Sequence, residues 1–438
     1  FVGVKEKPVP SLMRDFSAPV KIGQSVLSTK DLIFLMANDS NAFNRWEAAQ
    51  QLHERVLLDI TEIMSKKMSA NIDLREYGGA CEKVLMDESL SPGLRAEILT
   101  LPDRKIVLDK CQGFDLIALE RAYDLVQNQL AQGLKKALTT TYKKMMEGTK
   151  DTYTPEFADR RALKKYALKM LVQGEATQYD PDTEVIEACY QQFSNSNNMT
   201  DKLAALEAMA VLDLRECLPE IRRVRDRMME EFYKRYKDEP MVVDKWFALE
   251  ARYDNKDTFA HMRQMLKHPA FDITSPNKIR SLVRVFMREN LKNFHHHSGE
   301  GYEFVKDVIL KLKDRNPSMA SGMASILVAN VNLDTVRLAN MKRVLGEIKA
   351  SKGLPASVDE VVSKALMEIE AKQPLTKEEQ KAQVTRELLQ WEMDHGEDNP
   401  EMTRPPAHLL QFELEVSRSP SPSREENKKE EKSPRLVH

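Results

Sequence analysis

The stretch Met241-Val242-Val243-Asp244-Lys245-Trp246-Phe247-Ala248-Leu249 opens the part of the chain that decides the fold, residues 241–330. Four further phrases follow it: His268-Pro269-Ala270-Phe271-Asp272-Ile273, Asn277-Lys278-Ile279-Arg280-Ser281-Leu282, Gly301-Tyr302 and Arg315-Asn316-Pro317. Apolar residues recur here at helical spacing, and Pro and Gly mark the joints between the runs. The pattern predicts short amphipathic helices joined by tight turns.

The same helical period extends outward in both directions. Residues 115–146 read as one long helix or two abutting ones, and a stripe from Phe43 to Met64 predicts an earlier helix capped by Asp39 or Ser40. Further helices are expected at about 154–173, 181–193, 200–212, 216–236, 241–252, 256–267, 277–291, 302–313, 317–329, 333–351 and 356–370. Successive one-sided helices with short connections predict an all-α fold, an α-solenoid of armadillo or HEAT character.

The two ends of the chain differ from this middle. Residues 1–27 carry the only β-like pattern, with Ser11 to Ile22 extended between prolines and Gly23, and two short strands form no stable sheet alone. Together with a first residue, Phe1, that is not Met, this favours a chain cut from something longer. We expect a helical superhelix over 28–370, a charged helix over 371–393 and a disordered tail over 394–438. The Ser-Pro and Arg-Ser steps of the tail are either phosphorylation sites or idle.

Composition narrows the class of protein. The chain is 42% apolar and 31% charged, with a net charge of −2, which gives no reason to expect nucleic acid or an anionic membrane as a partner. No apolar run approaches the roughly 18 residues of a membrane helix. Cys81, Cys111, Cys189 and Cys217 stand far apart, which predicts reduced, mostly buried thiols in a cytoplasmic protein.

Two histidine patterns resemble metal sites, and both fall short. His53-Glu54-Arg55-Val56-Leu57 begins like the zinc-peptidase signature H-E-x-x-H, but Leu57 occupies the second ligand position. We therefore interpret His53 as a packed or interfacial residue. Adjacent His295, His296 and His297 precede a Ser-Gly turn, and we interpret them as an exposed loop. Phosphate-binding and nucleophile-elbow motifs are missing from the sequence.

Two basic clusters also lie on predicted helices. They are Arg160-Arg161-Ala162-Leu163-Lys164-Lys165 and Arg222-Arg223-Val224-Arg225. Because acidic residues surround both, solvated faces or ion pairs between helices are the first interpretation, and a polyanion site is the second.

Five phrases in one order resemble the alanyl aminopeptidase (aminopeptidase N) family of zinc metallopeptidases. They are residues 10–20 (PSLMRDFSAPV), 39–48 (DSNAFNRWEA), 198–201 (NMTD), 243–249 (VDKWFAL) and 277–282 (NKIRSL). The resemblance covers about residues 5–370. It implies that 1–27 are the last strands of an Ig-like β-sandwich and that 28–370 are the C-terminal helical domain. The zinc ligands and the exopeptidase motif would then lie before residue 1, so this chain binds no zinc itself.

The resemblance also implies candidate residues for a substrate channel. Arg280 matches a family arginine facing the cavity, where it would attract a peptide carboxylate; a helix-stabilising ion pair is the alternative. Positions that supply a Gln and an Arg in the family are here Ser318 and Gly322, with Met319 between them. Both are smaller and uncharged, which predicts a roomier, less selective pocket.

The resemblance therefore implies the channel-forming domain of a zinc-dependent aminopeptidase, without peptidase activity by itself. Its expected partners are a zinc catalytic domain, in cis or in trans, and peptide substrates. A free-standing helical-repeat scaffold that binds proteins is the alternative. Two explanations for the expected truncation stay open: a chain that is naturally short, and a sequence that comes from a fragmentary gene model.

Overall fold

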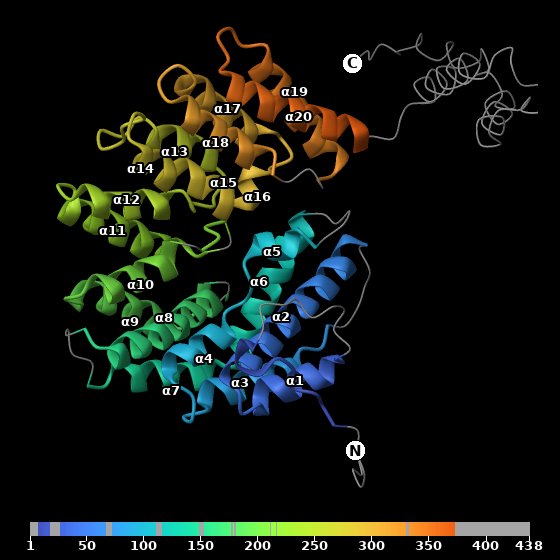
Figure 1. Ribbon diagram of the computed structural model, residues 1–438. Coiled ribbons are helices and arrows are strands. Elements are labelled where there is room, and N and C mark those ends of the chain that lie inside the picture. Colours follow the sequence, from blue (N-terminus) through green and yellow to red (C-terminus); the bar gives the residue numbers. More distant parts are fainter. Residues whose placement is uncertain are drawn as a thin grey trace, which may run out of the picture. The chain divides into compact units, whose positions relative to one another are not determined.

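The computed structural model describes residues 8–17, 27–66, 72–110, 116–148, 153–176, 178, 181–210, 212–215, 217–329 and 333–372 of the 438-residue chain. Those residues are all-α, as predicted (Figure 1). The predicted charged helix at 371–393 lies, apart from its first two residues, outside the described residues, as does all of the tail at 394–438. None of the described helices combines the length and the apolar content needed to cross a membrane.

The first half of the fold contains ten α-helices. In chain order they are α1 (Thr29–Asn38), α2 (Ala42–Ser65), α3 (Arg75–Met86), α4 (Pro92–Leu99), α5 (Arg104–Leu108), α6 (Leu116–Gly133), α7 (Lys135–Met146), α8 (Pro155–Ala176), α9 (Thr183–Asn195) and α10 (Met199–Ala210). The predicted run at 115–146 is thus two abutting helices, α6 and α7, which meet at Leu134.

The second half continues with shorter helices. They are α11 (Pro219–Tyr236), α12 (Pro240–Glu250), α13 (Thr258–Met265), α14 (Pro276–Ile279), η2 (Arg280–Arg284), α15 (Val285–Glu289), α16 (Leu291–Phe294), α17 (Glu300–Leu312), α18 (Pro317–Leu327), α19 (Thr335–Lys349) and α20 (Ala356–Lys372). Elements α14, η2 and α15 follow one another without a break, and η2 is a π-helical turn inside this run.

Helix starts follow from local capping chemistry. Ser28 and Asp31 form a reciprocal capping box at α1, and the Asn41 side chain accepts a hydrogen bond from the Asn44 N–H at α2. The cap of α2 is therefore Asn41 and not Asp39 or Ser40. Asn316 caps α18 by accepting from the Met319 N–H, and Pro317 fills the first helical position, where no N–H is needed.

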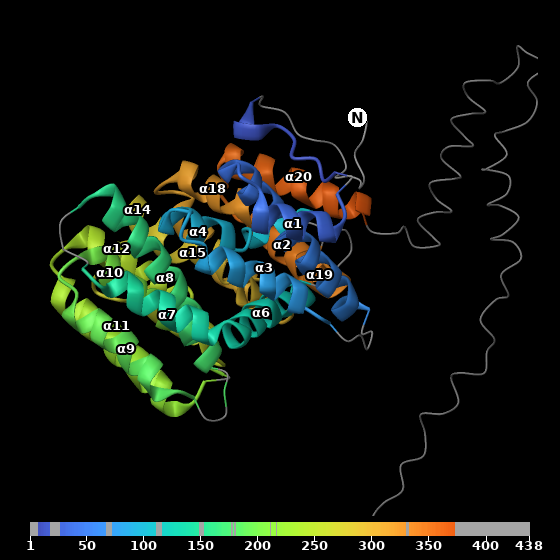
Figure 2. The ribbon, with the colours of Figure 1, turned by 90° about the horizontal axis from the view of Figure 1, so that it is seen from below.

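Neighbouring helices in the chain pack on one another. Helix α1 packs on α2, α7 on α8, α9 on α10 and α17 on α18 (Figures 1 and 2). Helix α8 contacts five others, α4, α6, α7, α9 and α10, and residues on all sides of it are buried. Its buried Lys164 is neutralised by Asp201 of α10, with Nζ 2.8 Å from Oδ1, because a buried charge requires a partner. Helix α6 also meets α16, so early and late helices touch.

The N-terminal strands are not seen in the part of 1–27 that the structure describes. Residues 8–17 contain a 3-10 turn, Arg14–Phe16, where the prediction placed extended chain. Local contacts with α2 explain the turn: the Asn41 amide donates to Asp15 Oδ1 at 2.5 Å, and the Phe16 and Phe43 rings lie 5.3 Å apart. Residues 1–7 and 18–26 lie outside the described residues, so the rest of the β prediction is untested.

The joint between α16 and α17 requires a glycine. A Cβ on Gly301 would lie 2.1 Å from the carbonyl oxygen of Phe294, closer than any side chain tolerates. This close approach lets α17 bury Tyr302, Phe304 and its aliphatic side chains completely. Each large apolar side chain buried in this way contributes about 1.5–3 kcal/mol.

Candidate functional site

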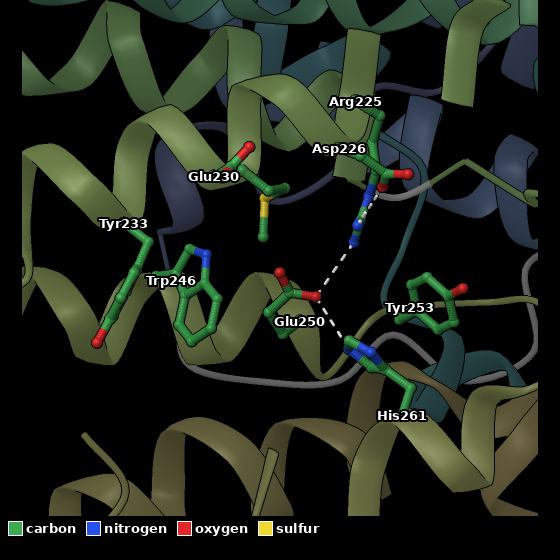
Figure 3. Close-up of a pocket in the computed structure, with 9 residues that line it drawn as sticks. Arg225, Asp226, Glu230, Tyr233, Trp246, Glu250, Tyr253 and His261 are labelled. Carbon is green, nitrogen blue, oxygen red and sulfur yellow. Dashed lines mark hydrogen bonds and ion pairs between the residues drawn. The ribbon is translucent and has the colours of Figure 1, made fainter. Parts of the chain in front are cut away.

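A pocket of about 330 Å³ lies between helices α11, α12 and α13 (Figure 3). Helix α11 supplies Arg225, Asp226, Met229, Glu230 and Tyr233, helix α12 supplies Trp246 and Glu250, and Tyr253 and His261 complete the lining. Trp246 and Glu250 are four residues apart on α12 and therefore share one face of that helix. The pocket combines aromatic walls with three carboxylates and a single guanidinium.

Glu250 is the buried carboxylate of this pocket. Its carboxylate is buried, and its Oε2 accepts from Arg225 at 3.4 Å and lies 2.9 Å from Nε2 of His261. Burial alone would raise the pKa of Glu250, but the Arg225 charge and the His261 contact outweigh it and hold the pKa below its usual value. Glu250 is therefore an anion at neutral pH.

A second polar cluster ties the turns after α10 and α12 to α16. The Arg215 guanidinium donates to Asp213 at 2.9 Å and to Asp254 at 2.7 Å, and Lys292 donates to Asp213 at 2.6 Å. Asn293 donates to Asp254 at 2.7 Å. Because each carboxylate already has several donors, this cluster fixes the geometry of three segments.

Two ionisable residues near this cluster have strongly shifted pKa values. Burial raises the pKa of Asp124 on α6 to about 6, and burial, with neighbouring cations, lowers that of Lys169 on α8 to about 8. Shifts of this size occur both in functional clefts and in structural charge clusters. A charged ligand bound near α6 or α8 would therefore change the protonation of Asp124 and Lys169.

The sequence-derived channel residues lie on two separate helices. Arg280 is exposed at the start of the π turn η2 and donates to the side chain of Asn277 at 3.2 Å. Ser318, Met319 and Gly322 lie on α18; Ser318 and Gly322 are exposed, and Met319 is half-buried. No hydrogen bond or ion pair among the described residues joins Arg280 to α18, and none gives Arg280 an acidic partner.

The histidine predictions have mixed outcomes. His53 is confirmed as a packed residue: it is fully buried, with Nε2 2.8 Å from the Ile98 carbonyl oxygen and Nδ1 2.8 Å from the Tyr77 hydroxyl. The prediction of an exposed loop was wrong for His295, which is fully buried with Nδ1 2.9 Å from the Tyr302 hydroxyl. The local turn signal hid this contact with a residue seven positions later.

The residues described do not fit a zinc ion. Both ring nitrogens of His53 already have partners, and Leu57, one helical turn later, is a buried core residue. No group of three His, Cys, Asp or Glu side chains in the described part of the chain is placed to hold a metal ion. Cys81, Cys189 and Cys217 are buried, as predicted, and Cys111 lies outside the described residues.

In the structure, several side chains of the two basic clusters form ion pairs with acidic residues. Lys164 pairs with Asp201 and Lys165 with Glu207, both on the neighbouring helix α10. Arg225 reaches Glu250 on α12. Ion pairs between helices, part of the first interpretation, are confirmed for Lys164, Lys165 and Arg225, whereas Arg223 pairs with Glu220 on its own helix. Sequence analysis missed Glu250 as the partner of Arg225, from which it is 25 residues away, and missed His261 as a second contact of Glu250. The shared face of Trp246 and Glu250 was the one available signal.

Comparisons with known proteins match most of this helical unit. Residues 29–367 match a family described as a domain of unknown function (DUF3458_C) with ARM repeats. The chain is 32% identical over 370 residues to aminopeptidase N of Escherichia coli and 30% identical over 369 residues to that of Caulobacter vibrioides. These matches cover 84% and 83% of this chain. The chain spans about 40% of the length of these relatives.

A solved structure agrees with these matches. A crystal structure of Legionella pneumophila aminopeptidase A in complex with aspartic acid is 27% identical in sequence, with a TM-score of 0.71. It covers 84% of this chain, which in turn covers 42% of that one. The chain therefore belongs to the DUF3458_C family of ARM-repeat domains and is homologous to the C-terminal part, about 40%, of aminopeptidase N.

Proposed function

We propose that this chain forms the substrate-channel wall of a zinc-dependent aminopeptidase that removes N-terminal residues from peptides. The observation that carries the proposal is the match to aminopeptidase N over 370 residues, which is nearly the whole described helical unit. The 438 residues contain no H-E-x-x-H sequence, so zinc chemistry would come from a catalytic domain joined in cis or bound in trans. In this role the helical domain encloses the reaction and limits which peptides reach it.

Arg280 is the residue proposed to attract substrate. It is exposed and has the side-chain amide of Asn277 as its hydrogen-bond partner, so its charge is available to a peptide carboxylate. Its place at a π turn is consistent with this role, because such turns often occur at functional sites.

Helix α18 is proposed to border the pocket beyond the scissile bond. A Cβ on Gly322 would meet no atom within 4 Å, and Ser318 is exposed. Small uncharged residues at these positions favour a roomy pocket with weak preference for the second residue of the substrate. Equal cleavage of dipeptides that differ in that residue supports this, and a preference for basic or polar residues contradicts it.

The first test is a reconstitution. The purified chain is assayed with an alanyl anilide, alone and mixed with the N-terminal three-fifths of E. coli aminopeptidase N, with and without a metal chelator. We expect no hydrolysis by the chain alone and chelator-sensitive hydrolysis by the mixture. Hydrolysis by the chain alone contradicts the proposal. Failure of the two parts to associate and raise activity also contradicts it, and favours a protein-binding scaffold.

The second test addresses Arg280 in the reconstituted enzyme. Arg280→Ala should raise KM for short peptides with a free C-terminal carboxylate by about tenfold while leaving KM for their amides unchanged. Arg288→Ala is the matched control, because Arg288 is an exposed arginine of α15 in the same helical run. Equal effects of the two substitutions would show that Arg280 has no specific role.

A further inference from the structure

The pocket between α11, α12 and α13 holds a buried hydrogen-bond donor that has no acceptor among the described residues. This donor is Nε1 of Trp246, a residue that is 6% exposed. Nε of Arg225 and Nε2 of His261, in the same lining, also have no hydrogen-bond partner among the described residues, although Nε2 of His261 lies within ion-pair distance of Glu250. Buried N–H groups are almost always hydrogen-bonded, because leaving one unpaired costs the full desolvation of the group. Figure 3 shows the indole nitrogen on the side of the ring that faces Glu230 and Glu250. An acceptor brought into the pocket would satisfy it.

Glu250 offers the complementary group beside it. Both of its contacts, from Arg225 and His261, are made to Oε2, and no hydrogen bond or ion pair to Oε1 is found among the described residues. Because Trp246 and Glu250 are one helical turn apart on α12, an N–H donor and a carboxylate oxygen are held side by side by a rigid element. The pair matches a ligand with a donor and an acceptor a few ångströms apart.

The surrounding charge selects a cation as that donor. Asp226 and Glu230 add two carboxylates to that of Glu250, but Asp226 pairs with Arg225 at 3.0 Å and Glu230 pairs with Lys234 at 2.6 Å. Three carboxylates against these two cations leave the pocket with an excess of negative charge. A positively charged donor to Glu250 gains a charge-assisted hydrogen bond, and a ligand carboxylate would be repelled. Asp226 and Glu230 are exposed, so the excess negative charge of the lining can attract such a cation from solvent.

We propose that this pocket binds the N-terminal residue of a peptide. The α-ammonium group donates to Oε1 of Glu250, and the carbonyl oxygen of the same residue accepts from Trp246 Nε1. The ammonium nitrogen and the carbonyl carbon of that residue are bonded to the same Cα, so both ligand groups can face the side of α12 that carries Trp246 and Glu250. The volume of about 330 Å³ lies at the lower end for ligand sites and accommodates one or two residues. The site lies entirely within this chain and does not depend on the proposed function.

Calorimetric titration of the full chain with L-alanyl-L-alanine amide tests the proposal. We expect saturable binding by this amide, no binding by its N-acetylated form, and at least about tenfold weaker binding by free alanine, whose carboxylate meets the acidic lining. Equal binding of the acetylated and free forms, or no binding of the amide, overturns the proposal.

Two variants assign the contacts. Glu250→Gln should weaken binding about tenfold or more, and Trp246→Phe, which keeps an aromatic ring but removes the N–H, about fivefold. Glu289→Gln and Trp46→Phe are the matched controls outside the pocket and should bind as the wild type does. Circular dichroism confirms that each variant is folded. If Glu250→Gln proves unfolded, the affinities of Trp246→Phe and Glu230→Gln test the assignment in its place. Unchanged affinity in the folded variants overturns the assignment.

Discussion

Replacement of Gly301 by alanine tests whether close backbone contact at the start of α17 holds the second half of the domain together. The added Cβ would lie 2.1 Å from the Phe294 carbonyl oxygen and 2.7 Å from the carbonyl carbon. Both are backbone atoms, so no side chain can rotate away, and α16 and α17 must separate by about 1 Å to reach an ordinary contact. Overpacking of this kind costs about 1–3 kcal/mol, and a backbone clash belongs at the upper end.

Separation of α16 and α17 would also strain the contact between the Tyr302 hydroxyl and His295 Nδ1, which is 2.9 Å long and fully buried. We therefore expect Gly301→Ala to lower the free energy of unfolding by about 3 kcal/mol in urea titrations followed by circular dichroism. Gly346→Ala is the control, because an added Cβ there meets nothing within 4 Å and α19 should gain about 0.5–1 kcal/mol. If both variants are as stable as the wild type, the close approach does not exist.

Three further predictions concern buried ionisable groups. His53 and His295 have pKa values lowered by burial to about 4 and 3, so the unfolded chain binds more protons below pH 6.5. Stability should then fall by about 1.4 kcal/mol per pH unit per histidine from pH 6.5 towards pH 4, and urea titrations of His53→Gln should show a shallower fall. Arg225→Met leaves the buried Glu250 carboxylate without its guanidinium and should cost about 3–5 kcal/mol in the same assay; a loss below 1 kcal/mol would show that His261 suffices. Burial raises the pKa of Cys81 to about 12, so maleimide at pH 7.5 should label it in urea and not in the native chain, as peptide mass mapping can measure.

Sequence analysis predicted those features that depend on neighbours along the chain. The apolar period predicted the helices on both sides of residue 241, and the break near Leu134 is where the helix expected at 115–146 divides in two. The apolar pattern also gave approximate starts for most of the helices after residue 150. The sequence did not predict which residue caps α2, because Asp39, Ser40 and Asn41 are all good N-cap residues. In the structure Asn41 has the required geometry.

Features set by distant contacts escaped the same reasoning. The run at His295 reads locally as a turn, yet His295 is buried because Tyr302 and Arg337 pack around it from α17 and α19. Similarly, Arg225 reads as one residue of a basic cluster, and only the packing of α11 on α12 brings it to Glu250. Residues 11–16 read as a strand, but hydrogen bonds to α2 favour a turn.

The distribution of partners among the buried charged groups separates residues that are already engaged from those that can still bind a ligand. In the described part of the chain the buried carboxylates of Asp201 and Glu250 have cationic partners, and the buried imidazoles of His53 and His295 are hydrogen-bonded. Such groups are poor general bases or metal ligands, because releasing them would leave a buried partner unpaired. Arg280 and the Trp246 N–H differ, since each retains hydrogen-bonding capacity on a helix that holds it in place. Groups of that kind can bind a peptide without reacting with it, which is consistent with the proposed role in guiding substrates.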